Sequence, residues 1–425
     1  MAGSLANLVI ELVRAAGVAL DWVVTYALHS TVIIGAVWWL TSRRSGLRLS
    51  PAHTSWLWMV ALVGGVLTAS LQVSGAVPAL GGTVRVGERV ATRAIFQMEV
   101  VAREEVATPG LAGPGPTHVV ARRTTIVPRW PLTLASIWVA GALLGLGALA
   151  LARWRFFRSI AMRRHAGSTP AAHVLGWVRA QAGVTRPVRL TVTDRLTSPV
   201  AIGRDEICLP ERVLAEMDHV QQESMLAHEL AHLERRDGWR LMVARVIEAV
   251  CFFQPLNRLA RRQMQDAAEL AADAWAVRVV NRPLVLARCL ARVAEWTVAS
   301  PRAMVPAMVE RSGSMLVHRV ARLTRAGGAD AAFRNPWPAV AMAALVLGSV
   351  LAAPRPVIGA APPAAGPPQW GAQTGVKVLM RPQSEAFRGW VAVDSVRLGV
   401  DRVMFIDRRS EIPRAEALIH VLRAR

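Results

Sequence analysis

Two histidines and a glutamate in the stretch HELAH have the types and spacing that a metal-dependent hydrolase needs. His228 and His232 are four residues apart, so on a helix they share one face and can contact the same metal ion. Glu229 lies beside them, where it can accept a proton from a metal-bound water and later pass it to a leaving amine. The bland alternative is a solvated helix that carries these residues by chance. The pattern therefore predicts a zinc site, with Glu229 as the catalytic base.

A zinc hydrolase also needs a third protein ligand and one open position. The best candidate is in DAAELAADAWAV, residues 266–277, where Glu269 and Asp273 lie four residues apart. We expect the HELAH helix to run without a break to the turn CFFQP, 251–255, and a second helix to return from there. The two legs are roughly 27 and 21 Å long, so an antiparallel hairpin brings Glu269 back to the histidines. Asp273 would then accept the free N–H of a ligand histidine. Taken alone, an exposed acidic helix face explains both residues equally well.

Long apolar runs must position this site at a membrane. The mean hydropathy is +0.33 and 53% of the residues are hydrophobic, which is high for a soluble enzyme. Four runs are candidate transmembrane helices, at 22–40, 55–77, 131–152 and 336–354. His29, inside the first run, is expected to be a hydrogen-bonded polar residue between helices and no metal ligand. The fold class predicted is an α-helical multi-pass membrane protein with an inserted α+β zinc-metallopeptidase domain and a small α+β C-terminal domain.

The distribution of arginine predicts the orientation. The net charge is +21, and the basic loop 41–50 and the basic stretch 153–165 should both face the cytosol. Three cysteines without a disulfide pattern, all in the peptidase segment, agree with a reducing compartment. The predicted order is a membrane region at 1–153 with an extracytoplasmic loop at 78–130, a cytosolic peptidase domain at 154–335, a fourth span at 336–354 and an extracytoplasmic linker and small domain at 355–425. The arginines form no dense block, so no direct nucleic-acid partner is expected.

Three further segments have weaker signals. Residues 188–210 alternate in polarity and are expected to form a β-ribbon, which could hold a peptide by strand addition or be merely structural. Arg319 could stabilise an oxyanion, but a surface position on its helix is the favoured interpretation. In the tail, WVAVDSVRLGVDRVMFI predicts a strand or hairpin, and RAEALIHVLRAR, 414–425, a helix.

Several of these stretches resemble one family. SPVAIG, ICLPERVL, LAHELAHLERRD and FFQPLNRLARRQMQDAAELAAD resemble the BlaR/MecR-type antirepressor membrane metallopeptidases, over roughly 1–355. The resemblance implies a gluzincin-type domain in a bacterial inner membrane, with His228, His232 and Glu269 as zinc ligands and Glu229 as base. It also implies regulated cleavage of a cytosolic repressor and of the chain itself. Whether the chain forms a homodimer is left open.

The tail departs from the family's pattern. The well-known receptors carry a C-terminal penicillin-binding sensor built round SxxK, whereas the single lysine here, Lys377, is preceded at the third position by Thr374. Sensing of β-lactams is therefore not expected, and the stimulus is unknown. Three rival readings are an intramembrane site-two type protease, a prenyl-protein or heat-shock type membrane protease, and a non-catalytic receptor with a structural zinc. The charges beside HELAH argue against an intramembrane protease, because burying them in lipid would be costly. The uneven division of the spans before and after HELAH argues against the prenyl-protein or heat-shock type. The presence of Glu229 argues against a structural zinc, which needs no base.

Overall fold

The structure is a computed structural model, and it describes residues 2–42, 49–76, 82–85, 130–299 and 306–325 together with short pieces of the rest. Those pieces are 340, 343–344, 348, 355–357, 376–377, 396–398, 401–404 and 422–423. The chain divides into two compact units. The larger unit, 14–85 and 130–358, holds the apolar helices and the predicted peptidase elements, and the smaller holds 1–13, 86–129 and 359–425.

Three described helices are long and apolar enough to cross a membrane. They lie in α1 (Ala2–Thr41), α2 (Pro51–Val73) and α4 (Trp130–Ser159). Each of the first three predicted spans overlaps one of these helices. Helices α1 and α4 extend beyond the predicted ends, and α2 lies four residues earlier than predicted at both ends. Ser50 caps α2 by accepting a hydrogen bond from the His53 N–H, and Pro51 follows at the first helical position. The predicted fourth span, 336–354, lies for the most part outside the described residues.

The peptidase elements surround a small sheet. Its strands are β2 (Arg164–His165), β3 (Arg189–Thr193), β4 (Val200–Ile202) and β5 (Glu206–Pro210), in the order β2-β3-β5-β4. Strands β3 and β5 are parallel, and the other two neighbouring pairs are antiparallel. The segment 188–210 thus contains three of the four strands, and β4 is an edge strand.

Helices α6 (Glu211–Glu216) and α7 (His219–Arg235) pack on this sheet. Helices α5 (Pro170–Gln181) and α10 (Pro283–Val298) pack on α7, and α11 (Pro306–Arg325) packs on α10. Leu226 and Leu230 of α7 are fully buried beside Ile207 and Leu209 of β5. Burial of each such side chain contributes about 1.5–3 kcal/mol. This core fixes α7, and therefore the HELAH histidines, against the sheet.

The helix that carries HELAH ends sooner than predicted. A capping box of Asp218 and Gln221 starts α7, and Arg236 ends it in the left-handed conformation, with φ of 56°. The Arg236 N–H still bonds to the last turn of α7, as in other left-handed helix ends. A separate helix, α8 (Asp237–Val250), then begins. The prediction of one unbroken helix from HELAH to the turn was wrong, because the turn at Arg236 redirects the chain.

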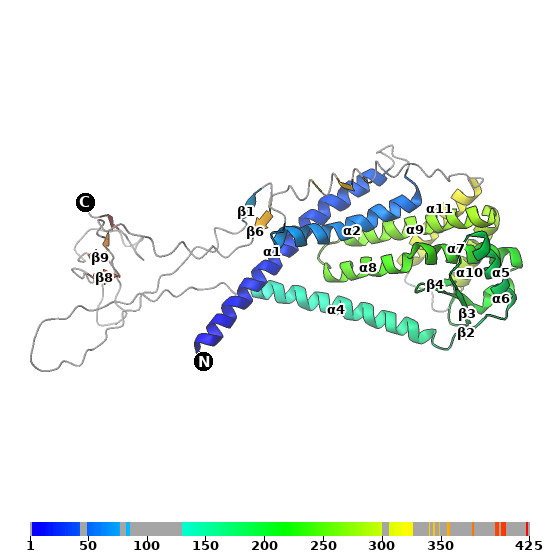
Figure 1. Cartoon of the computed structure of the whole chain (residues 1–425), viewed down its shortest axis with the longest axis horizontal. Coiled ribbons are helices and arrows are strands. Elements are labelled where there is room, and N and C mark those ends of the chain that lie inside the picture. Colours follow the sequence, from blue (N-terminus) through cyan, green and yellow to red (C-terminus); the bar gives the residue numbers. More distant parts are fainter. Residues whose placement is uncertain are drawn as a thin grey trace, which may run out of the picture. The chain divides into compact units, whose positions relative to one another are not determined.

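The hairpin of α8 and α9 (Leu256–Val280) packs against the apolar helices (Figure 1). Helix α9 lies along α2, and α8 lies along α4. One apolar cluster joins Trp58 and Leu62 of α2 to Ala244 of α8 and to Ala260 and Met264 of α9. The sequence-based division into a membrane region and a cytosolic domain does not anticipate this shared core.

Polar groups at the tip of the hairpin bond to α1. Gln254 Nε2 donates to the Ala27 carbonyl at 3.0 Å and to the hydroxyl of Ser30 at 2.9 Å. The Tyr26 hydroxyl donates to Asn257 Oδ1 at 2.9 Å. His29 Nδ1 lies 3.0 Å from Thr68 Oγ1 of α2, which fits its predicted role as a polar residue between helices.

The remaining strands are short. In the larger unit, β1 (Thr83–Arg85) pairs in parallel with β6 (Arg355–Val357). In the smaller unit, β8 (Val396–Leu398) and β9 (Asp401–Met404) form an antiparallel hairpin within the segment where a hairpin was predicted. β7 (Val376–Lys377) pairs with β9 and with β10 (Leu422–Arg423). At 422–423 the predicted helix is wrong, because these residues pair as a strand, and the rest of 414–425 lies outside the described residues.

Candidate active site

The histidines of α7 present their Nε2 atoms to each other. His228 Nε2 and His232 Nε2 are 3.2 Å apart, and the two rings are nearly perpendicular. The short distance between the two rings follows from the helical spacing of the histidines, and packing along the buried face of α7 leaves the rings little freedom to turn away. His228 is buried, and the His232 side chain is 16% exposed. Two nitrogen lone pairs are therefore directed at one small space.

Glu269 of α9 supplies a carboxylate to the same space. Its Oε2 lies 3.6 Å from His228 Nε2, and its Oε1 lies 3.9 Å from His232 Nε2. A zinc ion bound tetrahedrally, with bonds of about 2.0–2.1 Å, separates its donor atoms by roughly 3.4 Å. The separation of the two Nε2 atoms fits this geometry, and each of these nitrogens lies near a different oxygen of the Glu269 carboxylate. His228, His232 and Glu269 are also the residues identified as a group able to hold a metal ion among those that the structure describes.

Each histidine has a carboxylate on its other ring nitrogen. Asp273 Oδ1, one turn after Glu269 on α9, lies 3.1 Å from His228 Nδ1. Asp237 Oδ2, at the start of α8, lies 2.9 Å from His232 Nδ1. Such partners fix the tautomer in which Nε2 is free to bind a metal. Asp273 is where the sequence placed it, but sequence reasoning missed Asp237 because the left-handed turn that brings it back was not foreseen.

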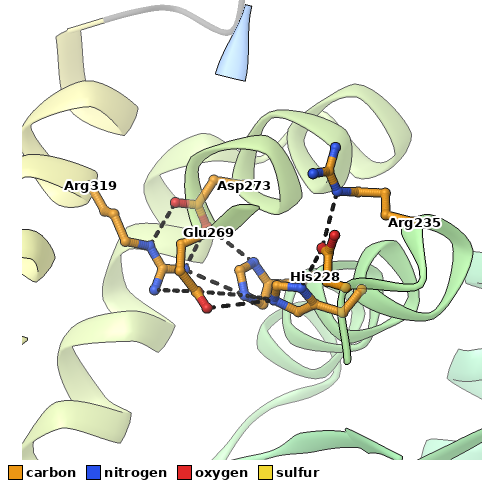
Figure 2. Close-up of polar contacts among 7 residues, drawn as sticks. His228, Arg235, Glu269, Asp273 and Arg319 are labelled. Atoms are coloured by element: carbon orange, nitrogen blue, oxygen red, sulfur yellow. Dashed lines mark hydrogen bonds and ion pairs between the residues drawn. The ribbon is translucent and has the colours of Figure 1, made fainter. Parts of the chain in front are cut away.

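Arg319 of α11 closes one side of the site (Figure 2). Its Nε and Nη2 donate to the two carboxylate oxygens of Asp273 at 2.8 and 2.7 Å, and its Nη1 lies 3.0 Å from Glu269 Oε2. The side chain is only 11% exposed, so the favoured prediction of a surface position was wrong. Helix α11 packs back over α10 and α9, which brings Arg319 inward. Each of its nitrogens lies near a carboxylate oxygen, and Nη2 is also 3.4 Å from His228 Nε2, so Arg319 is a positioning residue that holds Asp273 and Glu269 in place.

The charges of the site keep both carboxylates ionised. Burial works to raise the pKa of Asp273, but its bonds to Arg319 and His228 hold that pKa below its usual value. For Glu269, burial likewise works to raise the pKa, and His228, His232 and Arg319 together hold it well below its usual range. Burial alone would lower the pKa of His228, but Asp273 and Glu269 outweigh it and raise that pKa to about 9. The two ionised carboxylates thus favour a positive charge at His228, either a second ring proton or a bound metal ion.

Glu229 and an edge strand border a cavity at this site. The cavity has a volume of about 390 Å³, and its lining includes Glu229, both histidines and Glu269. Val200 and Ala201 of β4 form part of one wall. The edge of the sheet, the carboxylate of Glu229 and the candidate metal ligands therefore face one space that can admit a peptide.

Comparison with known families agrees with this geometry. Residues 22–284 match the model of a family described as the BlaR1 peptidase M56 family, which is more than half of the 425 residues. The chain belongs to the BlaR1 peptidase M56 family. A search of the curated proteins found no match for the chain.

Membership of the M56 family makes the chain a metallopeptidase, and with its three apolar helices it is a membrane protein. The matched region includes α2, α4, all four strands of the small sheet and the hairpin of α8 and α9. It therefore covers His228, Glu229, His232, Glu269 and Asp273 and ends before Arg319. The resemblance noted in the sequence is confirmed at the level of the family.

Proposed function

We propose that this M56 member is a zinc metalloendopeptidase with His228, His232 and Glu269 as ligands and Glu229 as the catalytic base. The observation that carries the proposal is the convergence of three donor residues, whose ligand atoms lie within 4.8 Å of one another, in a cavity that Glu229 also lines. A zinc ion held there would supply a Lewis acid and lower the pKa of an attacking water.

The residues of the chain have distinct parts in peptide hydrolysis. Glu229 accepts a proton from the attacking water and delivers it to the amine nitrogen as the peptide bond breaks. Asp273 and Asp237 hold the two imidazoles in the required tautomer. Arg319 keeps Glu269 and Asp273 ionised and oriented. The free edge of β4 lets an extended substrate add as a further strand, which places a peptide bond along the cavity.

Regulation through the membrane helices is part of the proposal. Helix α9 carries both Asn257, which is bonded to Tyr26 of α1, and Glu269 at the site. These two residues are about 18 Å apart along one continuous helix. A displacement of α1 relative to its neighbours would therefore be transmitted by α9 to a metal ligand. This arrangement suits a peptidase that is switched by a signal at the membrane.

The biological substrate is proposed from the resemblance of the sequence motifs to the BlaR/MecR-type antirepressors. This resemblance supports cleavage of a cytosolic, repressor-like regulator and of the chain itself. The arginines of 153–165 and the three free, buried cysteines support a cytosolic position for the peptidase elements in a bacterial inner membrane.

The test is cleavage of a peptide library by purified protein in lipid nanodiscs. Wild type should generate new termini that Glu229→Gln does not, and a chelator should abolish them until zinc is restored. Equal cleavage by wild type and Glu229→Gln would contradict the proposal, because no other group is assigned the role of base.

A further inference from the structure

A membrane helix forms part of the wall of the active-site cavity. Ser55 of α2 and Arg240 of α8 line the same cavity as His228, Glu229 and Glu269. The guanidinium carbon of Arg240 lies 4.2 Å from the ring centroid of Trp56, the neighbour of Ser55. This cation–π contact holds Arg240 against α2.

Arg240 has an incomplete set of polar contacts. Its Nη1 atom is buried and makes no hydrogen bond within the described part of the chain. The nearest recorded carboxylate oxygen, Asp237 Oδ1, is 3.6 Å away, too far for a good hydrogen bond. Asp237 is also shared with His232 and with Arg235, which donates to Oδ2 at 3.1 Å. Arg240 Nη1 and Asp237 Oδ1 therefore face each other at ion-pair distance without a hydrogen bond, and a ligand carboxylate would supply the closer acceptor that Nη1 lacks within the described residues.

The Ser55 hydroxyl also lacks a hydrogen-bond partner among the residues described. The side chain of Ser55 is fully buried. A buried hydroxyl is costly to leave unpaired, and Thr68, farther along the same helix, bonds to the carbonyl of Gly64. The free hydroxyl of Ser55 thus marks a place where a polar group of a ligand would complete the wall.

The charges beside Arg240 favour an anion. Two guanidinium groups, Arg235 and Arg240, share the single carboxylate of Asp237, while Glu229 adds a negative charge elsewhere in the cavity lining. Glu269 on the other side of the cavity is already paired with Arg319. A carboxylate bound to Arg240 would be neutralised and could accept a second hydrogen bond from Ser55.

We propose that Arg240 and Ser55 form a subsite that binds a carboxylate of the substrate, an aspartate or glutamate side chain close to the cleaved bond. The subsite makes an acidic residue a specificity determinant of this peptidase. It rests on the proposed function, since the cavity must be the substrate cleft. It also puts the wall of α2 in contact with the substrate.

The experiment compares paired peptide libraries that differ only by glutamate or glutamine at each position. Wild type should prefer glutamate at one position near the cleaved bond by roughly tenfold, the usual effect of a hydrogen bond to a charged group. Arg240→Gln should bring that ratio to about one, while Arg240→Lys, which keeps the charge, should retain a preference. Ser55→Ala should reduce the ratio less. Arg245→Gln removes the same charge from the exposed face of α8 and should leave the preference unchanged.

A binding measurement separates this inference from the peptidase assignment. Glu229→Gln and the double variant Glu229→Gln/Arg240→Gln are exposed to the library, and the retained peptides are identified by mass spectrometry. Enrichment of acidic peptides by the first and not by the second supports the subsite even if no form cleaves. Absence of acidic enrichment in Glu229→Gln, or a glutamate preference that survives Arg240→Gln with unchanged metal content, would overturn it.

Discussion

His232 and Asp237 face each other across the left-handed turn at Arg236, with Nδ1 of the histidine 2.9 Å from Oδ2 of the aspartate. The turn lets a residue outside the HELAH helix fix the orientation of a ligand inside it. Burial works to raise the pKa of Asp237, but His232 and Arg235 outweigh it and lower that pKa, so the aspartate stays ionised.

Asp237→Asn should weaken zinc binding about 10- to 100-fold, because the histidine loses its ionised partner. Competition with a fluorescent chelator measures this affinity. Glu234→Gln, at a neighbouring carboxylate that pairs with Arg186 instead, is the matched control and should leave the affinity unchanged. An unchanged affinity in Asp237→Asn would show that the turn does not serve the metal site.

Gly145 of α4 allows the hairpin to approach the membrane helices. A Cβ atom there would lie 3.1 Å from the Ala249 carbonyl oxygen and 3.2 Å from its Cβ. Gly145→Leu should therefore destabilise the protein by about 1–3 kcal/mol through overpacking. The midpoint of thermal unfolding in detergent measures the effect. Gly147→Leu is the matched control on the same helix, since a Cβ at Gly147 meets nothing within 4 Å, and an equal loss in both variants would refute the contact.

Gln254 couples the start of α9 to α1. Replacement by leucine removes its bonds to Ala27, Ser30 and Thr31, each worth about 0.6 kcal/mol on average between membrane helices. We expect faster hydrogen exchange in the first turns of α9, while exchange in α7 stays the same. Gln181→Leu, at the exposed end of α5, should change neither. Unchanged exchange in α9 would mean that the tip is held by apolar packing alone.

The stability of the small sheet should fall at acid pH through Glu206. Two groups donate to this buried carboxylate: Arg163 Nε at 2.5 Å and the Thr191 hydroxyl at 2.8 Å. The bond from Arg163 is the largest cause that lowers the pKa of Glu206. The stabilisation is thus complete above the pKa of the unfolded state, about 4.3, and is lost as the pH falls through the lower pKa of the folded state. Thermal unfolding from pH 7 to 3 should show a steeper acid decline for wild type than for Glu206→Gln. Parallel declines would rule out this contribution.

The sequence was sufficient for the residues that follow regular spacing. His228 and His232 share a face because they are four apart. Glu269 returns to them because α8 has 14 residues and Glu269 is the fourteenth residue of α9, the returning helix. The positions of Asp237 and Arg319 were not accessible in this way. Asp237 depends on one left-handed residue, and Arg319 depends on how α11 folds back over the core. Tertiary packing determines the positions of both side chains, and local sequence patterns do not predict that packing.

The membrane region shows the same limit. Apolar length was enough to find α1, α2 and α4, because a span needs about 20 apolar residues. The packing of the α8 and α9 hairpin against them could not be foreseen, since its charged residues favoured an aqueous position. The structure pairs two of these charges within the hairpin, Arg261 with Glu248 at 2.5 Å. The place of Ser55 in the cavity wall also depends on this packing, so it could not be predicted from a segment whose sequence indicates only a transmembrane span.

The most direct test of the account is elemental analysis of zinc in purified protein in detergent. Wild type and Glu229→Gln should each hold about one zinc per chain, because Glu229 is the base and no ligand. His228→Ala and Glu269→Ala should lose the metal while keeping the helical content seen by circular dichroism. Zinc retained in both ligand variants, or absent from folded wild type, would contradict the assignment of this site.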